Sequence, residues 1–237
     1  MPARRVRRVP EYREVVYSEE HWALLGRLRE EAMRIMEVLA SAGFWPVVHG
    51  SVVRGDVHED SDVDVVLLTP VQPYVVEELA SRRGLSIVSR RLVMATPAST
   101  PKVYFYLDHE GRRTISVFLG KPSKAEHDFY FFSGIADLEE LRRGARKPGV
   151  NKELVLIVPT ARGHVEMPLK GNEHYAARLL GADIQAIIER EEVLSRRDEV
   201  GRTGVFLDVE ITPEETVEEA LDRIARSNPF LRRYYRG

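Results

Sequence analysis

The 237-residue chain contains no cysteine, which excludes disulfide bonds, thiolate metal sites and cysteine nucleophiles. Lysine is scarce, since only six of the 35 basic residues are lysines and the others are arginines. Asparagine and glutamine are also few. This composition is compatible with a thermophilic source, although a preference for arginine is not a general marker of thermophiles.

Long apolar runs and a strong net charge are absent as well. No run approaches the roughly 18 apolar residues of a transmembrane helix, and the arginine-rich N-terminus lacks the apolar region of a secretory signal. We therefore expect a cytoplasmic protein without a membrane partner. The formal net charge is −2, so any basic surface for nucleic acid must be local. With 43% hydrophobic and 30% charged residues, the composition is that of a globular protein of one large or two small domains.

A glycine–serine pair follows the first strand that the sequence predicts. The apolar run 44–48 indicates a buried strand, which delivers Gly50 and Ser51 to a turn. Glycine allows a close approach of the backbone to a phosphate, and serine adds a hydroxyl and an N–H group at the same turn. The pair therefore suits the binding of a nucleotide phosphate.

Two aspartates stand at the start of the second predicted strand, 63–68. Side chains alternate between the faces of a strand, so Asp62 and Asp64 point in the same direction, about 7 Å apart along the chain. Two neighbouring carboxylates repel each other unless a positive group lies between them. Mg²⁺ is typically bound by one or two carboxylates together with substrate phosphates. The two motifs together predict a site for a metal–nucleoside triphosphate complex.

Charged side chains near these motifs have two interpretations each. Arg54 either neutralises phosphate charge, since a guanidinium matches phosphate oxygens bidentately, or forms an ion pair with Asp56 or Asp60. His49 and His58 flank the motifs, and each is either a ligand or a structural residue whose hydrogen bonds are satisfied within the protein.

A resemblance to a known family rests on these same residues. Gly50-Ser51, a spacer of ten residues, Asp62-Val63-Asp64 and the apolar strand resemble the signature of the polymerase β-like nucleotidyltransferases. The wider stretch 49–68 looks most like uncharacterised archaeal members of this superfamily, and the resemblance covers roughly residues 40–119.

The resemblance implies an α+β nucleotidyltransferase fold, with helices packed on a mixed sheet. It implies that a nucleoside monophosphate is transferred from ATP or another nucleoside triphosphate, with two Mg²⁺ ions as cofactors. Asp62 and Asp64 would be catalytic metal ligands, and Gly50, Ser51 and Arg54 would bind the nucleotide. RNA, DNA and a protein are the candidate acceptors.

The resemblance also implies a third carboxylate on a later strand, which would bind the second metal and activate the acceptor. The best match for that strand is 114–118, where Ser116 occupies the position expected for an aspartate. Asp108, at the end of the neighbouring strand, is the candidate third catalytic residue, although aspartate is also a common turn residue. Glu126 and Asp128 follow in the next loop. Without a third carboxylate, the alternative function is a catalytically silent regulatory protein that binds nucleotide or nucleic acid.

The rest of the pattern places helices around these strands. Ser18 caps a predicted helix that Gly43 ends, and Pro73 opens a second helix that Gly84 ends. The segment 212–215 has the pattern of a capping box for the last helix. Further strands are predicted at 86–95, at 102–107 and 113–119 in a hairpin, and at 154–158 and 164–167.

The second half of the chain has a different pattern from the first. We expect a nucleotidyltransferase domain at 1–134 and a smaller α/β or winged-helix-like domain at 135–237. Within the latter, the segment 172–198 is typical of a helix-turn-helix with its turn at Gly181. Residues 201–209 resemble a small hairpin wing, so the segment either contacts nucleic acid or is simply a packing unit of two helices.

Four further groups of residues have both a functional and a structural interpretation. They are the basic arm Arg4, Arg5, Arg7 and Arg8, the aromatic run 129–132, the metal candidates His164, Glu166 and His174, whose spacing matches no tight ligand motif, and the basic pair Arg196 and Arg197.

Overall fold

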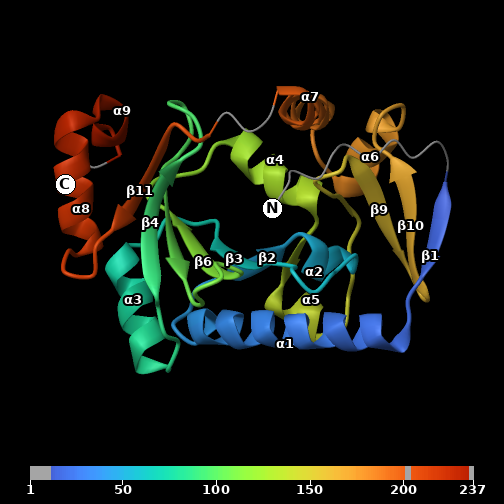
Figure 1. Cartoon of the computed structure of the whole chain (residues 1–237), viewed down its shortest axis with the longest axis horizontal. Helices are drawn as coiled ribbons and strands as arrows, with labels where there is room; N and C mark the ends of the chain where they lie inside the picture. The colour runs from blue at the N-terminus through green and yellow to red at the C-terminus, as the bar shows by residue number, and fades with distance from the viewer. Residues whose placement is uncertain (1–11, 201–203, 235–237) are drawn as a thin grey trace. The chain divides into compact units, whose positions relative to one another are not determined.

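The computed structural model describes residues 12–200 and 204–234 and shows an α+β protein with two sheets (Figure 1). The chain divides into two compact units, and each unit is assembled from three segments. The first unit contains residues 1–31, 48–61 and 124–204, and the second contains residues 32–47, 62–123 and 205–237. The units are interleaved along the chain, whereas the predicted boundary at residue 134 divides it once, and that boundary stays a prediction. The N-terminal basic arm and residues 201–203 of the predicted wing lie outside the described residues.

The first unit contains a four-stranded antiparallel sheet. Its strand order is β1-β10-β9-β8, of which Figure 1 labels β9, β10 and β1 side by side. Strands β9 and β10 are the two strands predicted from the apolar pattern of this region. The bounds are Arg13–Val16 for β1, Gly149–Val150 for β8, Val155–Thr160 for β9 and Gly163–Pro168 for β10.

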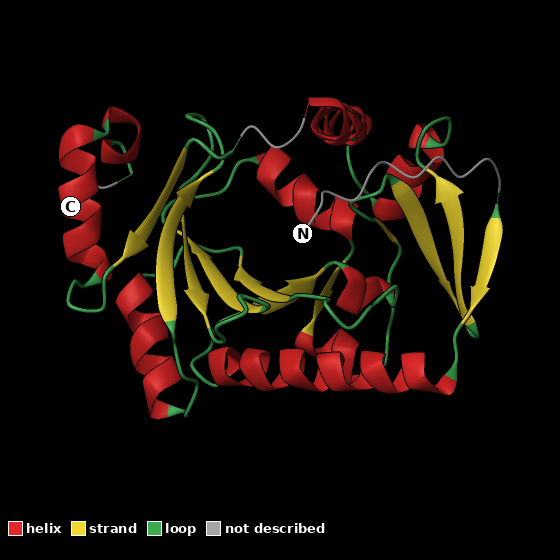
Figure 2. Cartoon of the chain, in the orientation of Figure 1, coloured by secondary structure: helices red, strands yellow, loops and turns green. Residues whose placement is uncertain are grey.

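Helices contribute most of the remaining structure of the first unit (Figure 2). Helix α1, Glu19–Ala40, begins in this unit and ends in the second. The other elements are α2 (Ser51–Arg54), α4 (Lys124–Ser133), β7 (Ile135–Asp137), α5 (Leu138–Arg142), α6 (Glu173–Leu180) and α7 (Ile184–Val200). Among the described residues 12–200 and 204–234, no helix combines the length and the apolarity that would let it cross a membrane.

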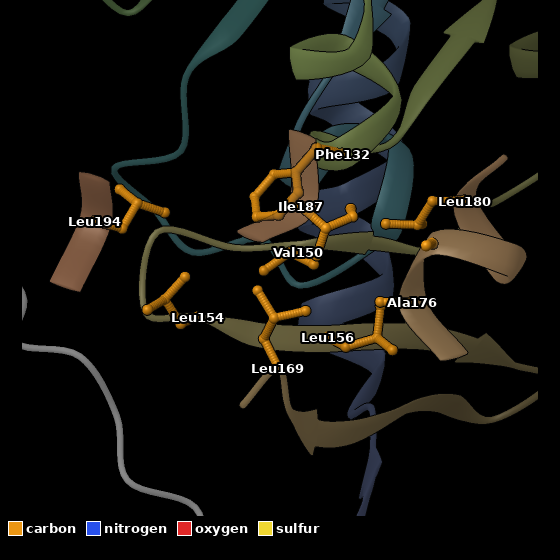
Figure 3. Packing of buried hydrophobic residues seen from close by; sticks show 10 residues of the cluster. Phe132, Val150, Leu154, Leu156, Leu169, Ala176, Leu180, Ile187 and Leu194 are labelled. Carbon is orange, nitrogen blue, oxygen red and sulfur yellow. The ribbon is translucent and has the colours of Figure 1, made fainter. Parts of the chain in front are cut away.

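A buried hydrophobic cluster forms the core of the first unit (Figure 3). It joins side chains of β8, β9, α4, α6 and α7, and Phe132 of the aromatic run takes part in it. Tyr130 is also buried, whereas Phe131 is 41% exposed, so the run fills the core at alternate positions of α4. The cluster consists of Phe132, Val150, Leu154, Leu156, Leu169, Ala176, Ala177, Leu180, Ile187 and Leu194.

The three metal candidates of this unit are arranged differently from one another. His164 and Glu166 are buried on β10, with Nε2 of the histidine 3.5 Å from Oε1 of the glutamate. Nδ1 of His164 is hydrogen-bonded to the Tyr17 hydroxyl at 2.6 Å, and burial lowers the pKa of the imidazole. His174 is exposed on α6. Among the described residues, His164 and Glu166 thus lie together on β10, with Tyr17 as the hydrogen-bond partner of the histidine, whereas His174 lies on a different element.

The second unit contains the sheet that carries the aspartate pair. Within this unit the strand order is β11-β4-β5-β6-β3-β2, where β2 begins in the second unit and ends in the first. Strands β3 and β6 are parallel, whereas the pairs from β11 to β6 are antiparallel. The strands are β2 (Pro46–His49), β3 (Val63–Leu67), β4 (Ser89–Met94), β5 (Lys102–Tyr106), β6 (Arg113–Phe118) and β11 (Leu207–Ile211). The helices are α3 (Pro73–Arg82), α8 (Val217–Ser227), α9 (Pro229–Arg232) and the end of α1. The mixed sheet with packed helices agrees with the fold class predicted from the sequence.

Alternate positions divide this sheet into an apolar face and a polar face. Residues paired across neighbouring strands lie on the same face. Asp64 is paired with Thr114, and Thr114 is paired with Tyr106. One step along the strands on that polar face, Ser116 is paired with Tyr104. The apolar face consists of residues that are at most 2% exposed, including Val63, Val65, Leu67, Val103, Phe105, Ile115 and Val117.

The segment after α7 differs from the predicted wing. Residues 207–211 form β11, which pairs antiparallel with β4, for example with Val209 opposite Leu92. The strand therefore extends the sheet of the second unit, where it covers the edge of β4. Helices α6 and α7 do follow one another across Gly181, which has a left-handed φ of 64°. Both predicted helices are thus confirmed, and their contact with nucleic acid stays a prediction.

Candidate functional site

The glycine–serine turn lies between β2 and the short helix α2, in the first unit. Gly50 has φ 88° and ψ −148°, a backbone conformation that is essentially restricted to glycine. Its N–H donates to the carbonyl of Gly134 at 3.0 Å, and its own carbonyl accepts the N–H groups of Val53 and Arg54 at 3.1 Å. No atom of the described residues 12–200 and 204–234 would lie within 4 Å of a Cβ atom built on Gly50. The glycine is therefore required by the backbone, and its Cβ side is open.

Alanine at Gly50 is expected to lower the free energy of unfolding by about 1–3 kcal/mol, the usual cost of a residue in a sparsely populated conformation. Gly26 is the matched control because it also has open space where a Cβ atom would lie, but it is inside α1 and has no positive φ. Alanine at Gly26 is expected to raise stability by about 0.5–1 kcal/mol. Urea denaturation of both variants measures the contrast, and equal effects at the two glycines would contradict the argument.

Two side chains of α1 donate hydrogen bonds to backbone carbonyls at and near the turn. The Arg29 Nε group donates to the carbonyl of Val52 at 3.1 Å, and Nη2 donates to the carbonyl of Ala145. Nε2 of His21 donates to the carbonyl of Gly55 at 2.8 Å. Burial, together with the nearby charge of Arg146, lowers the pKa of Arg29 to about 10. Two backbone carbonyls that follow the turn, those of Val52 and Gly55, therefore accept hydrogen bonds from side chains of α1.

Arg54 has the ion-pair geometry that was one of its two interpretations. Its Nε and Nη2 groups donate to the two carboxylate oxygens of Asp56 at 2.9 and 3.0 Å, and Nη1 donates to the carbonyl of Ser133 at 2.6 Å. The arginine side chain is 6% exposed and that of Asp56 is 13% exposed. Arg54 thus links the segment after Ser51 to Asp56 and to the carbonyl of Ser133. Its contact with nucleotide phosphate stays a prediction.

The hydroxyl groups of this region form a short chain. Ser51 Oγ donates to Ser61 Oγ at 3.3 Å, and Ser61 Oγ accepts the N–H of His58 at 2.9 Å. Nδ1 of His49 is hydrogen-bonded to Ser133 Oγ at 3.2 Å, and its ring packs edge-on against Tyr130. His49 therefore has the structural role that its sequence position also allowed.

The aspartate pair lies at the start of β3, in the second unit. Asp62 directly precedes the strand and Asp64 is its second residue, and both side chains are partly exposed. Thr114 Oγ1 donates to Oδ1 of Asp64 at 2.6 Å. This hydrogen bond follows from the strand register, which pairs the two residues directly across β3 and β6.

The neighbour of Asp64 on β6 is therefore a different residue from the one expected. The sequence placed Ser116 at the position of the third carboxylate, but the parallel register puts Ser116 beside Val66. Thr114 occupies the position next to Asp64, and both hydroxyl residues are buried. The sequence carried the signal for Thr114 in the alternation of polar and apolar residues along 113–118, but only the pairing with β3 shows which polar residue faces the aspartate.

Asp108 lies in the turn between β5 and β6. Its Oδ1 accepts the N–H groups of Arg112 and Arg113 at 2.7 and 3.3 Å, which is the turn-residue geometry. The carbonyl of Arg112 in turn accepts the N–H of Val63 at 2.7 Å. The turn therefore lies at the same end of the sheet as the aspartate pair. The turn role of Asp108 is observed, and its catalytic role stays a prediction.

Two tyrosines extend the polar face beyond Thr114. The rings of Tyr104 and Tyr106 are stacked with centroids 6.4 Å apart, and the ammonium group of Lys102 lies 5.1 Å from the Tyr104 centroid. Burial raises the pKa of Tyr106, and the charge of Asp64 contributes to the shift. A hollow of about 380 Å³ at Tyr106 is lined further by Arg91 and by the β5–β6 turn. Sequence reasoning did not single out these residues.

Comparison with known protein families supports the motif-based interpretation. Residues 46–94 match the family model described as a nucleotidyltransferase domain. The match contains both the Gly50–Ser51 turn and the Asp62–Asp64 pair and ends with the last residue of β4. Comparisons with curated proteins and with solved structures gave no significant match.

The donor set can be compared with the needs of a cation. Among residues 12–200 and 204–234, no group of three or more histidine and acidic side chains has the geometry of a metal site. Mg²⁺, however, commonly uses only one or two carboxylates and keeps water and phosphate oxygens as its other ligands. The carboxylates of Asp62, just before β3, and of Asp64, its second residue, fit that requirement.

Proposed function

We propose that the protein is a Mg²⁺-dependent nucleotidyltransferase that moves a nucleoside monophosphate from ATP or another nucleoside triphosphate to an acceptor hydroxyl. The observation that carries the proposal is the family match at 46–94, because this one segment contains both the phosphate-binding turn and the aspartate pair. The open Cβ side of Gly50 and the partly exposed carboxylate of Asp64 support it.

Each motif has a role in this proposal. Asp62 and Asp64 hold Mg²⁺, which when bound neutralises phosphate charge in the manner of metal-assisted phosphoryl chemistry. The Gly50 backbone and the Ser51 N–H and hydroxyl bind the outer phosphates. The acceptor hydroxyl attacks the α-phosphorus, the bond to the bridging oxygen of the β-phosphate breaks, and pyrophosphate leaves. Asp108 is the proposed base that takes the proton of the acceptor hydroxyl.

The direct test incubates the protein with each of the four α-labelled ribonucleoside triphosphates and Mg²⁺. Pyrophosphate release and transfer of label are measured with RNA, DNA and the protein itself as acceptors. Transfer that depends on Mg²⁺ supports the proposal. Tight nucleotide binding without pyrophosphate release, with every acceptor, contradicts it.

A second function has one specific observation in its favour. The residue beside Asp64 on β6 is Thr114 and not a carboxylate, which agrees with a catalytically silent protein that binds nucleotide. In that case nucleotide binds and no pyrophosphate is released. A regulatory role on RNA or DNA would add salt-sensitive binding, which should weaken when Arg196 and Arg197 are replaced.

A further inference from the structure

We infer that Thr114 is a positioning residue for the cation site, because its hydroxyl fixes the Asp64 carboxylate so that one oxygen is committed to the protein and the other is directed to the cation. This inference rests on the proposed function, since it assigns a role at the same aspartate pair.

The direction of the hydrogen bond is determined by chemistry. An ionised carboxylate only accepts hydrogen bonds, whereas a threonine hydroxyl has one proton to donate. The distance of 2.6 Å between Thr114 Oγ1 and Asp64 Oδ1 lies in the range of charge-assisted O–H···O⁻ bonds. Such bonds are stronger than neutral ones, so this contact orients the carboxylate.

The backbone around the contact gives it little freedom. The parallel register pairs Val63 with Arg113, Asp64 with Thr114 and Val65 with Ile115, so the contact lies inside a continuous ladder. Val65 and Ile115 are fully buried, and Thr114 is 4% exposed. Threonine is branched at Cβ, which restricts its χ1 rotamers in a strand. The donor is therefore held in place before a cation binds.

The arrangement has a functional consequence for the second oxygen. With Oδ1 of Asp64 bound by Thr114, Oδ2 remains for coordination at the partly exposed polar face. Replacement of a residue that is hydrogen-bonded to a metal ligand typically lowers metal affinity or activity by about 10–100-fold. Thr114 is placed for this role although it would not itself touch the cation.

Ser116 provides the matched control on the same strand. It is a buried hydroxyl residue on the same face, but it is paired with Val66 instead of an aspartate. Removal of the Ser116 hydroxyl should therefore leave the cation site unchanged, whereas removal of the Thr114 hydroxyl should not.

The experiment measures binding of Mn²⁺, as a paramagnetic substitute for Mg²⁺, by the loss of the free-ion signal in electron paramagnetic resonance. Thr114→Val, which keeps the shape of the side chain, is expected to weaken Mn²⁺ binding about 10–100-fold. Thr114→Ser restores the hydroxyl and should bind within a few-fold of the wild-type protein, as should Ser116→Ala. Circular dichroism establishes that each variant is folded. If the valine variant is not, Thr114→Ala, which also removes the hydroxyl, takes its place, and it should likewise bind Mn²⁺ more weakly than Thr114→Ser.

The outcomes separate the inference from the proposed function. If the wild-type protein binds Mn²⁺ and Asp64→Asn abolishes binding, but Thr114→Val binds normally, the positioning role is wrong and the proposed site stands. Equal weakening in the valine and serine variants would also overturn the role, since the serine variant keeps the hydroxyl that the valine variant lacks. If the wild-type protein does not bind Mn²⁺ with or without ATP, both the inference and the Mg²⁺ site are wrong.

Discussion

Asparagine at Asp62 or at Asp64 is expected to lower the rate of pyrophosphate release by about 10²–10³-fold, the cost of losing one electrostatic contact to the transferring group. Asparagine keeps the size of aspartate but removes the charge that a hard cation requires. The rate is measured with a coupled pyrophosphate assay at saturating triphosphate and Mg²⁺. The double variant should be no more active than the worse of the two single variants, because both carboxylates act on the same ion.

Asp60→Asn is the control for this series. Asp60 is exposed and lies two residues before the pair, so its replacement changes the net charge by the same amount. We expect its activity to stay within a few-fold of the wild type. Loss of activity in the Asp60 variant would show that the effect is not specific to the aspartate pair. Activity that survives both changes at the pair would show that the pair is not the catalytic centre.

Replacement of Arg54 by methionine is expected to lower the free energy of unfolding by about 3–5 kcal/mol, the usual cost of breaking a buried ion pair. The change leaves the carboxylate of Asp56 largely buried without the two guanidinium N–H donors that it has in the wild-type protein. It also removes the donor to the carbonyl of Ser133. Urea denaturation followed by circular dichroism gives the free energy.

An exposed ion pair of the same chemistry supplies the comparison. Arg82 pairs with Glu78 one helical turn away, but its side chain is 74% exposed. Arg82→Met should therefore cost no more than about 0.5 kcal/mol. The double variant Arg54→Met/Asp56→Asn should lose less free energy of unfolding than the sum of the losses in the two single variants. The second change removes the buried carboxylate charge that the first leaves unpaired. Additive effects would show that the pair is not coupled as the geometry indicates.

Much of the second unit could be predicted from the sequence, because its strands have strong local signals. Strand β3 has apolar residues at every position except Asp64, and the hairpin of β5 and β6 has strand-forming residues on both sides of a turn. The turn at Gly50 was also predictable, since a glycine before serine at the end of a buried strand indicates a turn. Local propensity and structure agree at each of these elements.

The neighbour of Asp64 could not be predicted, because strand register depends on contacts between distant segments. Thr114 and Ser116 are both small hydroxyl residues at alternate positions, and the choice between them is set by the pairing of β6 with β3. No local signal in 113–118 carries that information. The same limit applies to β11, whose partner β4 is far away in the sequence.

The start of α8 shows a different limit. Two segments have the same Thr-x-x-Glu pattern, and the structure uses Thr216 and Glu219 as the capping box, in place of the predicted Thr212 and Glu215. The carboxylate of Glu215 is occupied by Arg223 at 2.8 and 2.7 Å. The Thr-x-x-Glu pattern alone therefore does not determine where the helix begins.

The late position of β11 has a consequence for synthesis on the ribosome. Strand β4 is complete once Met94 has been made, but the strand that covers its outer edge begins only at Leu207. Until then the nascent chain presents an unpaired strand edge, which is a template for association with other chains. Shortening the protein from its C-terminus into residues 207–211 should therefore produce insoluble protein before it reveals anything about activity.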